Sequence, residues 1–93
     1  MFKKTWWKGI ISDSGFAVNI KPPNKVEYRE GDKLLIAYMD MLRGDPAIDI
    51  DSNSIKSWLP PHQNEPLTPE KKQEILNNIC DALRFSGLTY VIR

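Results

Sequence analysis

Residues 68–87 read TPEKKQEILNNICDALRFSG and carry the signals of an amphipathic helix. Thr68 is a favoured N-cap, and Pro69 suits the first helical position because its missing N–H would have no partner there. Gly87 is typical of the position just beyond a helix C-terminus. Placing successive residues about 100° apart gathers six apolar side chains on one face, namely Ile75, Leu76, Ile79, Cys80, Ala82 and Leu83. The pattern predicts a helix over residues 69–86.

Short apolar runs separated by turn signals precede this helix. Phe16, Val18 and Ile20 recur at every second position, which is the period of a half-buried strand. The run from 33 to 42 begins like a central strand, but its end fits either a strand or a short helix. The strands expected from these patterns cover residues 6–12, 16–21, 26–29, the start of 33–42, 48–51 and, after the helix, 88–92.

The order of these elements predicts the fold class. Strands come first, then one helix, then one strand, which is typical of an α+β protein. We expect an antiparallel β-sheet with the C-terminal amphipathic helix packed on one face, followed by a last strand. The length of 93 residues is that of one domain, so residues 1–93 are expected to form a single unit.

The cysteine content and the N-terminus indicate a compartment. Cys80 is the only cysteine, so no disulfide can form within the chain, and small secreted domains usually need such bonds. The lysines near the N-terminus are not followed by an apolar stretch as long as a signal peptide requires. No run approaches the roughly 18 apolar residues of a membrane span. We therefore expect a cytoplasmic protein without membrane contact.

The residue types needed for catalysis are scarce. His62 is the only histidine and Cys80 the only thiol, so the sequence allows a single Cys–His pair. A packed thiol and a solvated loop histidine account for these two residues better. Zinc sites need three or four His or Cys ligands, and the calcium-like run 49–54 lacks the required glycine and glutamate. We expect no catalytic, cofactor-binding or metal-binding residues, and a binding protein rather than an enzyme.

Charge is balanced overall but not along the chain. The formal net charge is +1, yet residues 33–65 hold five acidic side chains against three basic ones. Four aspartates lie close together there: Asp40, Asp45, Asp49 and Asp51. One interpretation is a solvated surface that only keeps the protein soluble. The other is an acidic patch that matches a basic partner and speeds the encounter with it.

Tryptophan supplies a second indication of binding. Trp58 stands beside a proline-rich connector, residues 60–66, and exposed tryptophans are typical anchors of protein interfaces. Trp6 and Trp7 must point to opposite faces of a strand. Flanked by lysines, they also fit an alternative function, a small nucleic-acid-binding or regulatory module. The near-neutral charge of the chain makes nucleic acid the less favoured partner. The lysines concerned are Lys3, Lys4 and Lys8.

Several short segments carry a family resemblance. They are SGFAV at 14–18, YREGD at 28–32, SIKSW at 54–58, the pair Pro60-Pro61, and the helix residues Asn78, Ile79, Ala82, Leu83, Arg84, Phe85 and Gly87. Together with a tryptophan-bearing first strand, they resemble the small single-domain immunity proteins encoded beside bacterial polymorphic toxins. Immunity proteins of contact-dependent growth inhibition systems are among these.

The resemblance implies a function. It implies a bacterial cytoplasmic protein that neutralises a cognate toxin C-terminal domain by forming a tight stoichiometric complex. Such toxins are often nucleases with cationic active sites, which an acidic inhibitor surface would suit. The family motif places no contact residue, so the residues expected to bind the partner, Asp40, Asp45, Asp49, Asp51 and Trp58, come from the sequence pattern alone. The oligomeric state stays open.

Overall fold

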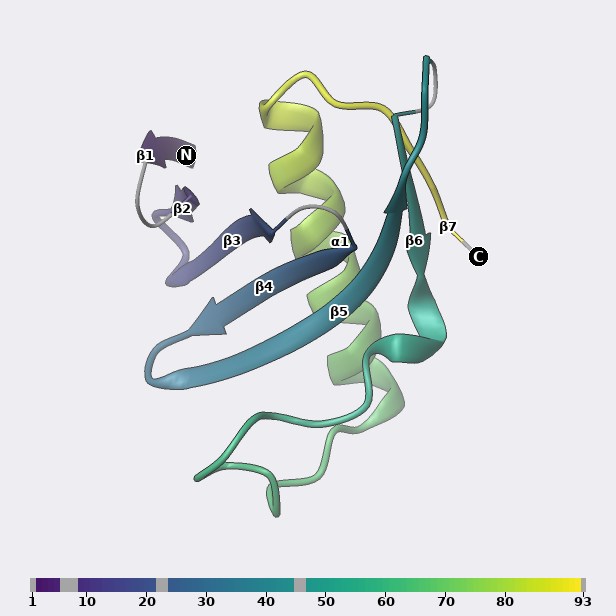
Figure 1. Ribbon diagram of the computed structural model, residues 1–93. Coiled ribbons are helices and arrows are strands. Elements are labelled where there is room, and N and C mark those ends of the chain that lie inside the picture. Colours follow the sequence, from purple (N-terminus) through teal and green to yellow (C-terminus); the bar gives the residue numbers. More distant parts are fainter. Residues whose placement is uncertain (1, 6–8, 22–23, 45–46, 93) are drawn as a thin grey trace.

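The computed structural model describes residues 2–5, 9–21, 24–44 and 47–92. Its elements in chain order are β1 Phe2–Thr5, β2 Gly9–Ser12, β3 Phe16–Lys21, β4 Lys25–Glu30, β5 Lys33–Met41, β6 Ile48–Asp51, the short 3₁₀ helix η1 Ser52–Ser54, α1 Pro69–Phe85 and β7 Tyr90–Ile92 (Figure 1).

The strands of the described residues form one sheet whose spatial order, from β1 to β7, follows the sequence. Each adjacent pair is antiparallel except β6 and β7, which run parallel. The parallel pair is possible because η1, the connector and α1 lie between these two strands and give the chain room to return. Figure 1 shows the sheet curling around α1, which lies against one face. The predicted α+β class, with a C-terminal helix and a last strand, is confirmed.

Helix α1 has the N-cap, the C-terminal glycine and the buried face that were predicted for it. The hydroxyl of Thr68 accepts a hydrogen bond from the backbone N–H of Lys71 at 3.1 Å and so caps the helix. Gly87 has a φ of +78°, a left-handed conformation that ends helices and that side chains with a Cβ disfavour. All six residues of the predicted apolar face are buried. The helix ends at Phe85, one residue earlier than predicted.

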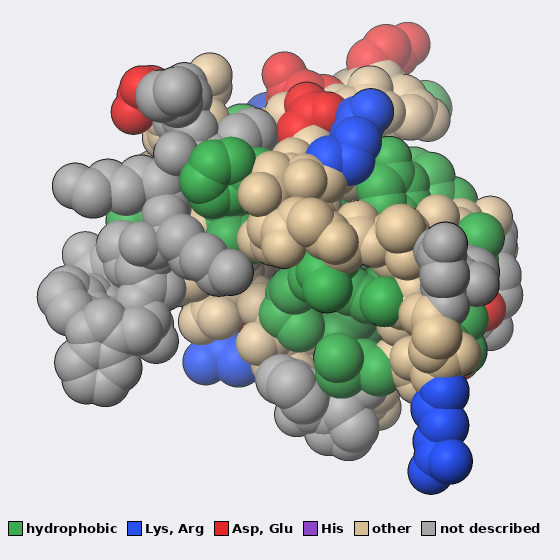
Figure 2. All heavy atoms as spheres, turned by 90° about the horizontal axis from the view of Figure 1, so that it is seen from above, with side chains coloured by type: hydrophobic (Ala, Val, Ile, Leu, Met, Phe, Trp, Pro, Cys, Tyr) green, Lys and Arg blue, Asp and Glu red, His purple; other side chains and the backbone are tan. Residues whose placement is uncertain are grey.

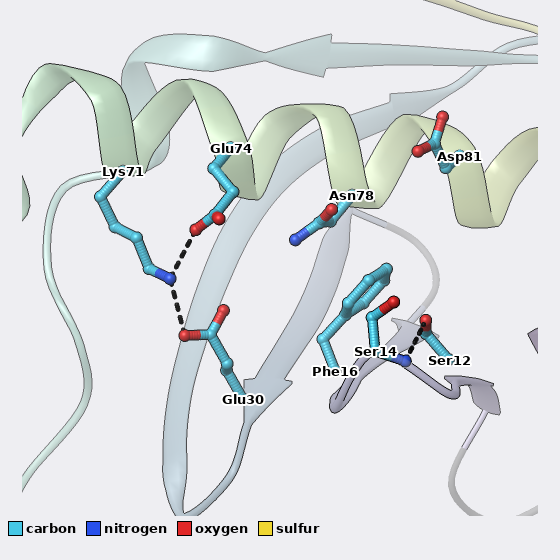
Figure 3. Close-up of a pocket in the computed structure, with 8 residues that line it drawn as sticks. All are labelled: Ser12, Ser14, Phe16, Glu30, Lys71, Glu74, Asn78 and Asp81. Carbon is cyan, nitrogen blue, oxygen red and sulfur yellow. Dashed lines mark hydrogen bonds and ion pairs between the residues drawn. The ribbon is translucent and has the colours of Figure 1, made fainter.

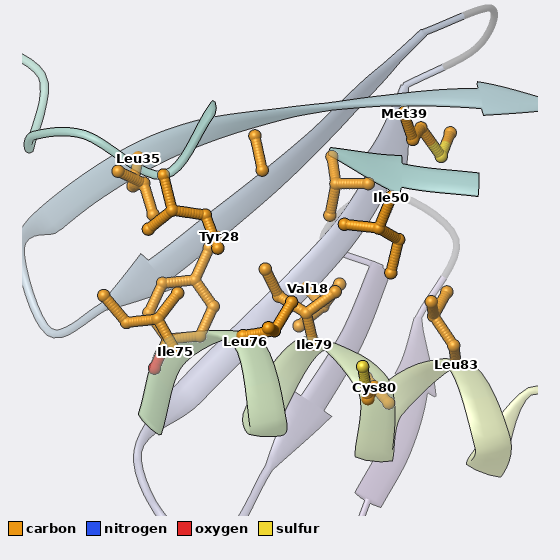
Figure 4. Packing of buried hydrophobic residues seen from close by; sticks show 14 of the residues in the cluster. Val18, Tyr28, Leu35, Met39, Ile50, Ile75, Leu76, Ile79, Cys80 and Leu83 are labelled. Atoms are coloured by element: carbon orange, nitrogen blue, oxygen red, sulfur yellow. The ribbon is translucent and has the colours of Figure 1, made fainter. Parts of the chain in front are cut away.

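The core lies between α1 and the face of the sheet that the helix covers (Figure 4). Each central strand contributes every second residue to it, as the alternation predicted for half-buried strands. The largest fully buried side chains are Tyr28, Leu35, Met39, Ile48, Ile50, Ile75, Ile79, Leu83, Val18 and Val26. Because these residues come from both α1 and the sheet, helix and sheet stabilise one another.

The N-terminal region differs from the prediction of one strand over residues 6–12. Strand β2 begins only at Gly9, and a further strand, β1, pairs with it in antiparallel register. Gly9 has a φ of +79°, and a Cβ there would lie 2.4 Å from the carbonyl oxygen of Val18. Only glycine fits both conditions. Trp6 and Trp7 lie outside the described residues.

Strand β5 settles the ambiguity of residues 33–42. It remains a strand as far as Met41, because β4 pairs with its first part and β6 with its last. Hydrogen bonding from both sides therefore decides the conformation of an apolar run whose own pattern fits two structures.

Candidate protein-interaction surface

Three of the four predicted aspartates lie together on the outer face of β5 and β6. Their register places Asp40 directly opposite Asp49, and Tyr38 directly opposite Asp51. Residues between them point the other way and are buried, as Met39 shows. Since side chains alternate across a strand, these four lie on the face that α1 does not cover. We call Tyr38, Asp40, Asp49 and Asp51 the acidic face.

The aspartates of the acidic face differ in surroundings. Asp40 is exposed, whereas Asp49 and Asp51 are half-buried. Asp51 has a structural role, because its Oδ1 accepts a hydrogen bond from the backbone N–H of Asn53 at 3.1 Å and caps η1. The register sets two carboxylates, those of Asp40 and Asp49, side by side on the exposed face of the sheet. A pair of negative charges in this position attracts cationic side chains of a partner.

Exposed apolar side chains border these carboxylates. Tyr38 is 48% exposed and Val91, the β7 neighbour of Asp49, is 43% exposed. Met41 and Leu42, at the end of β5, are exposed as well. Figure 2, a view from above onto the end where α1 finishes, shows that apolar side chains also gather on that surface. Apolar contact area beside charge is the composition of protein interfaces.

Two predicted site residues do not join the acidic face. Asp45 lies outside the described residues. Trp58 is only 2% exposed and packs in the core. The centroid of its ring lies 6.3 Å from that of the Tyr28 ring, and the Lys33 ammonium lies 5.8 Å from the Trp58 ring centroid. The interpretation of Trp58 as an exposed anchor does not fit this burial. The chain after Trp58 folds back onto β5, where the backbone N–H of Leu59 donates a hydrogen bond to the Leu34 carbonyl. This contact holds the Trp58 indole in the core.

Sequence reasoning missed Tyr38 and Val91 as surface residues. The signal for Tyr38 was present, because it lies two residues before Asp40 in the same strand and must share its face. No local signal places Val91 beside Asp49, because their neighbourhood depends on the parallel pairing of β6 and β7.

A polar hollow of about 600 Å³ lies on the helix side of the sheet, between α1 and the turn from β2 to β3 (Figure 3). Its lining residues are Ser12, Ser14, Phe16, Glu30, Lys71, Glu74, Asn78 and Asp81. The Lys71 ammonium lies between two carboxylates, 2.7 Å from Glu30 and 2.6 Å from Glu74.

Tyr28 extends this network into the core. Its hydroxyl donates to Glu30 at 2.8 Å and accepts from the Asn78 amide at 2.9 Å. Burial raises the pKa of the Tyr28 hydroxyl. Burial alone would raise the pKa of the Glu30 carboxyl too, but hydrogen bonds from Lys71 and Tyr28 outweigh it and hold that pKa below its usual value. Burial likewise opposes the charge of Lys71, and its two carboxylate partners raise its pKa nonetheless.

A comparison with models of protein families assigns the chain to a family. A family model described as Immunity protein 74 matches residues 22–93, well over half of the sequence. The chain belongs to the immunity protein 74 family. No curated protein and no solved structure matches it. The resemblance to immunity proteins of polymorphic toxins is thereby confirmed.

The family match covers the two surfaces unequally. It begins at residue 22, so β4 to β7, α1 and the whole acidic face of this immunity protein lie within it. The polar hollow straddles its limit, because Ser12, Ser14 and Phe16 precede the matched residues.

Potential catalytic groups of the immunity protein lie in separate surroundings. Cys80 is 4% exposed in the core, and burial raises the pKa of its thiol. His62 lies in the connector, with Nε2 3.7 Å from a carboxylate oxygen of Asp32. In the part of the chain that the structure describes, no three His, Cys, Asp or Glu side chains form a possible metal site. Among the described residues, no helix is long and apolar enough to cross a membrane.

Proposed function

We propose that this immunity protein neutralises a cognate toxin domain by binding it directly in a tight one-to-one complex, through the acidic face. The observation that carries the proposal is the register that sets Asp40 against Asp49 beside the exposed ring of Tyr38. Family membership supplies the class of partner. The protein then acts by occupancy and not by turnover.

The chemistry of the acidic face fits a toxin domain with a basic surface, such as a nuclease whose active site binds phosphates. Lysine and arginine side chains of such a domain would lie against Asp40 and Asp49, whose negative charges attract them. The complex would form in the bacterial cytoplasm, as in contact-dependent growth inhibition systems. Asp45 and Asp51 would add charge around the contact.

Tyr38 is suited to be the anchor of this interface. Tyrosine is enriched among the residues that dominate binding energy, because one rigid side chain offers both apolar area and a hydroxyl. Its place on β5, a strand paired on both sides, holds the ring on a rigid base. Carboxylates beside it form a polar rim, which is the usual anatomy of an interface.

The test uses the toxin domain encoded beside the immunity gene. Mixed with the wild-type protein, it should elute as a one-to-one complex in size-exclusion chromatography and lose its toxic activity in proportion to occupancy. Tyr38→Ala should weaken binding by about 2 kcal/mol or more. Tyr28→Ala is no useful comparison because it empties the core, so the matched control is Phe85→Ala, which removes a 46% exposed ring on α1, away from the acidic face. Full affinity of Tyr38→Ala would contradict the proposed anchor.

The nucleic-acid alternative rests on Lys3, Lys4, Trp6, Trp7 and Lys8, whose side chains lie outside those the structure describes. It predicts that oligonucleotides bind the protein without a toxin, with strong dependence on salt. The same chromatography, run with a labelled oligonucleotide, separates the two functions.

A further inference from the structure

The polar hollow between α1 and the β2–β3 turn has no part in the interface proposed above. It opens on the side of the sheet that carries α1, whereas the acidic face lies on the opposite side. Its volume of about 600 Å³ falls within the range of ligand-binding sites. Figure 3 shows Asn78 extending from α1 above Phe16 and Ser14, which lie on the sheet side, while the Asp81 carboxylate lies higher, alongside the helix.

Hydrogen bonding leaves mainly acceptors free in this hollow. The Asn78 amide nitrogen donates to Tyr28, so its carbonyl oxygen Oδ1 remains available. One carboxylate oxygen of Asp81 accepts from Arg84, and one of Glu74 accepts from Lys71. Among the described residues these three side chains have no further hydrogen bond, so each keeps a free acceptor oxygen.

The charge of the lining favours a cation. Three carboxylates, those of Glu30, Glu74 and Asp81, stand against two cations, Lys71 in the lining and Arg84, which pairs with Asp81, so one negative charge is left in excess. Lys71 is already held by two of them, and both contacts are short. A ligand that enters the hollow therefore meets excess negative charge and several acceptors, and it needs hydrogen-bond donors and a positive charge to satisfy them.

The acceptors of the hollow lie on two of its walls, and a ligand group with several donors in one plane, such as a guanidinium, can reach both. Its five N–H donors lie in one plane and can reach acceptors on two walls at once, here Asn78 and Asp81 on the helix and Ser14 on the turn. Phe16 closes the hollow with an aromatic ring, against which a planar cation packs favourably. We propose that this hollow is a receptor site for an arginine side chain of a protein partner, distinct from the acidic face.

The experiment titrates the full-length protein with N-acetylarginine methylamide and follows backbone amide shifts by NMR. Shifts should be confined to the hollow, at Ser14, Phe16, Asn78 and Asp81. The citrulline counterpart, which has nearly the same shape without the charge, should bind at least about tenfold more weakly. Equal binding of the two compounds, or shifts centred on Tyr38 and Asp40, would overturn the proposal.

Paired variants separate this site from the proposed toxin interface. Glu74→Gln combined with Asp81→Asn replaces two largely exposed carboxylates, so it should fold normally and lose at least about tenfold in arginine affinity. Asp40→Asn should leave that affinity unchanged. If Asp40→Asn weakens arginine binding as much as the double variant does, the hollow is not the receptor. Failure of toxin binding at the acidic face would leave both results unaffected.

Discussion

Tyr28 joins the helix to the sheet through its hydroxyl group. It is fully buried, its ring lies 5.7 Å from that of Phe16 and 6.3 Å from that of Trp58, and its hydroxyl bridges Asn78 of α1 and Glu30 of β4. A buried polar group is tolerated when its hydrogen bonds are satisfied, and this one makes two. Tyr28 thus combines packing with a polar link between two layers.

Removing only that hydroxyl tests the link. Tyr28→Phe keeps the ring but leaves the Asn78 amide and one Glu30 oxygen without their partner, so it should lower the free energy of unfolding by about 1–3 kcal/mol. Tyr38→Phe is the matched control, because its ring is 48% exposed and the change should stay within about 0.5 kcal/mol. Urea denaturation of both variants measures the two values. Equal effects would mean that the hydroxyl bridge contributes nothing.

Glu30 gives a prediction about pH. Its folded-state pKa is held down by Lys71 and Tyr28, so its contribution to stability is present above the pKa of the unfolded state and is lost as pH falls through the lowered folded pKa. The wild type should therefore exceed Glu30→Gln in unfolding free energy at about pH 7, and the difference should shrink towards about pH 3. Repeating the comparison in a Lys71→Met background should diminish the pH dependence. If the difference in unfolding free energy between wild type and Glu30→Gln grew as the pH fell, the pKa of Glu30 would be raised by folding and not lowered.

At the scale of elements, α1 is the element whose structure depends most on its own local sequence. Its cap, its proline, its apolar face and its stop are local features, and all of them formed as predicted. Strands β3, β4 and β6 were likewise predictable, because period-two alternation is local. The end of β5 was not, since pairing with β6 decided it, and β1 was missed because Phe2–Thr5 contains a single apolar residue and no alternation.

The packing of α1 against the sheet yields the third prediction. Leu83 is fully buried, so Leu83→Ala should cost about 2–5 kcal/mol in unfolding free energy. Lys72→Ala, an exposed change on the same helix, should cost less than about 0.5 kcal/mol. Thermal and urea unfolding together measure both. A neutral Leu83→Ala would show that the helix packs through a different face.

At the scale of the whole molecule, the proposed binding surfaces depend on neighbourhoods that no single segment contains. The four aspartates were found from the sequence, but the pairing of Asp40 with Asp49 beside Tyr38 required the register of β5 and β6. Trp58 was misjudged because the connector folds it into the core, and the polar hollow exists only once α1 docks near the β2–β3 turn. Composition sets the net charge near neutrality, whereas folding gathers aspartates on β5 and β6 and sets Lys25 of β4 beside them, directly opposite Tyr38.

The separation of charge leads to a kinetic expectation for toxin binding. Charges at the rim of an interface mainly change the association rate and its salt dependence, and a desolvated pair changes affinity by about 2–5 kcal/mol when one side is truncated. Asparagine keeps the size and most hydrogen bonding of aspartate, so Asp40→Asn with Asp49→Asn isolates the charge. Asp32→Asn is the matched control, because Asp32 is 88% exposed and lies in the turn between β4 and β5.

The decisive measurement is the association rate of the cognate toxin domain with the wild type, the Asp40→Asn/Asp49→Asn variant and Asp32→Asn, at low and at high salt. The double variant should associate about tenfold more slowly than the wild type at low salt, and the gap should narrow at high salt because ions screen the interaction. Asp32→Asn should match the wild type in both conditions. A double variant that binds as fast and as tightly as the wild type at low salt would contradict the assignment of the acidic face as the toxin-binding surface.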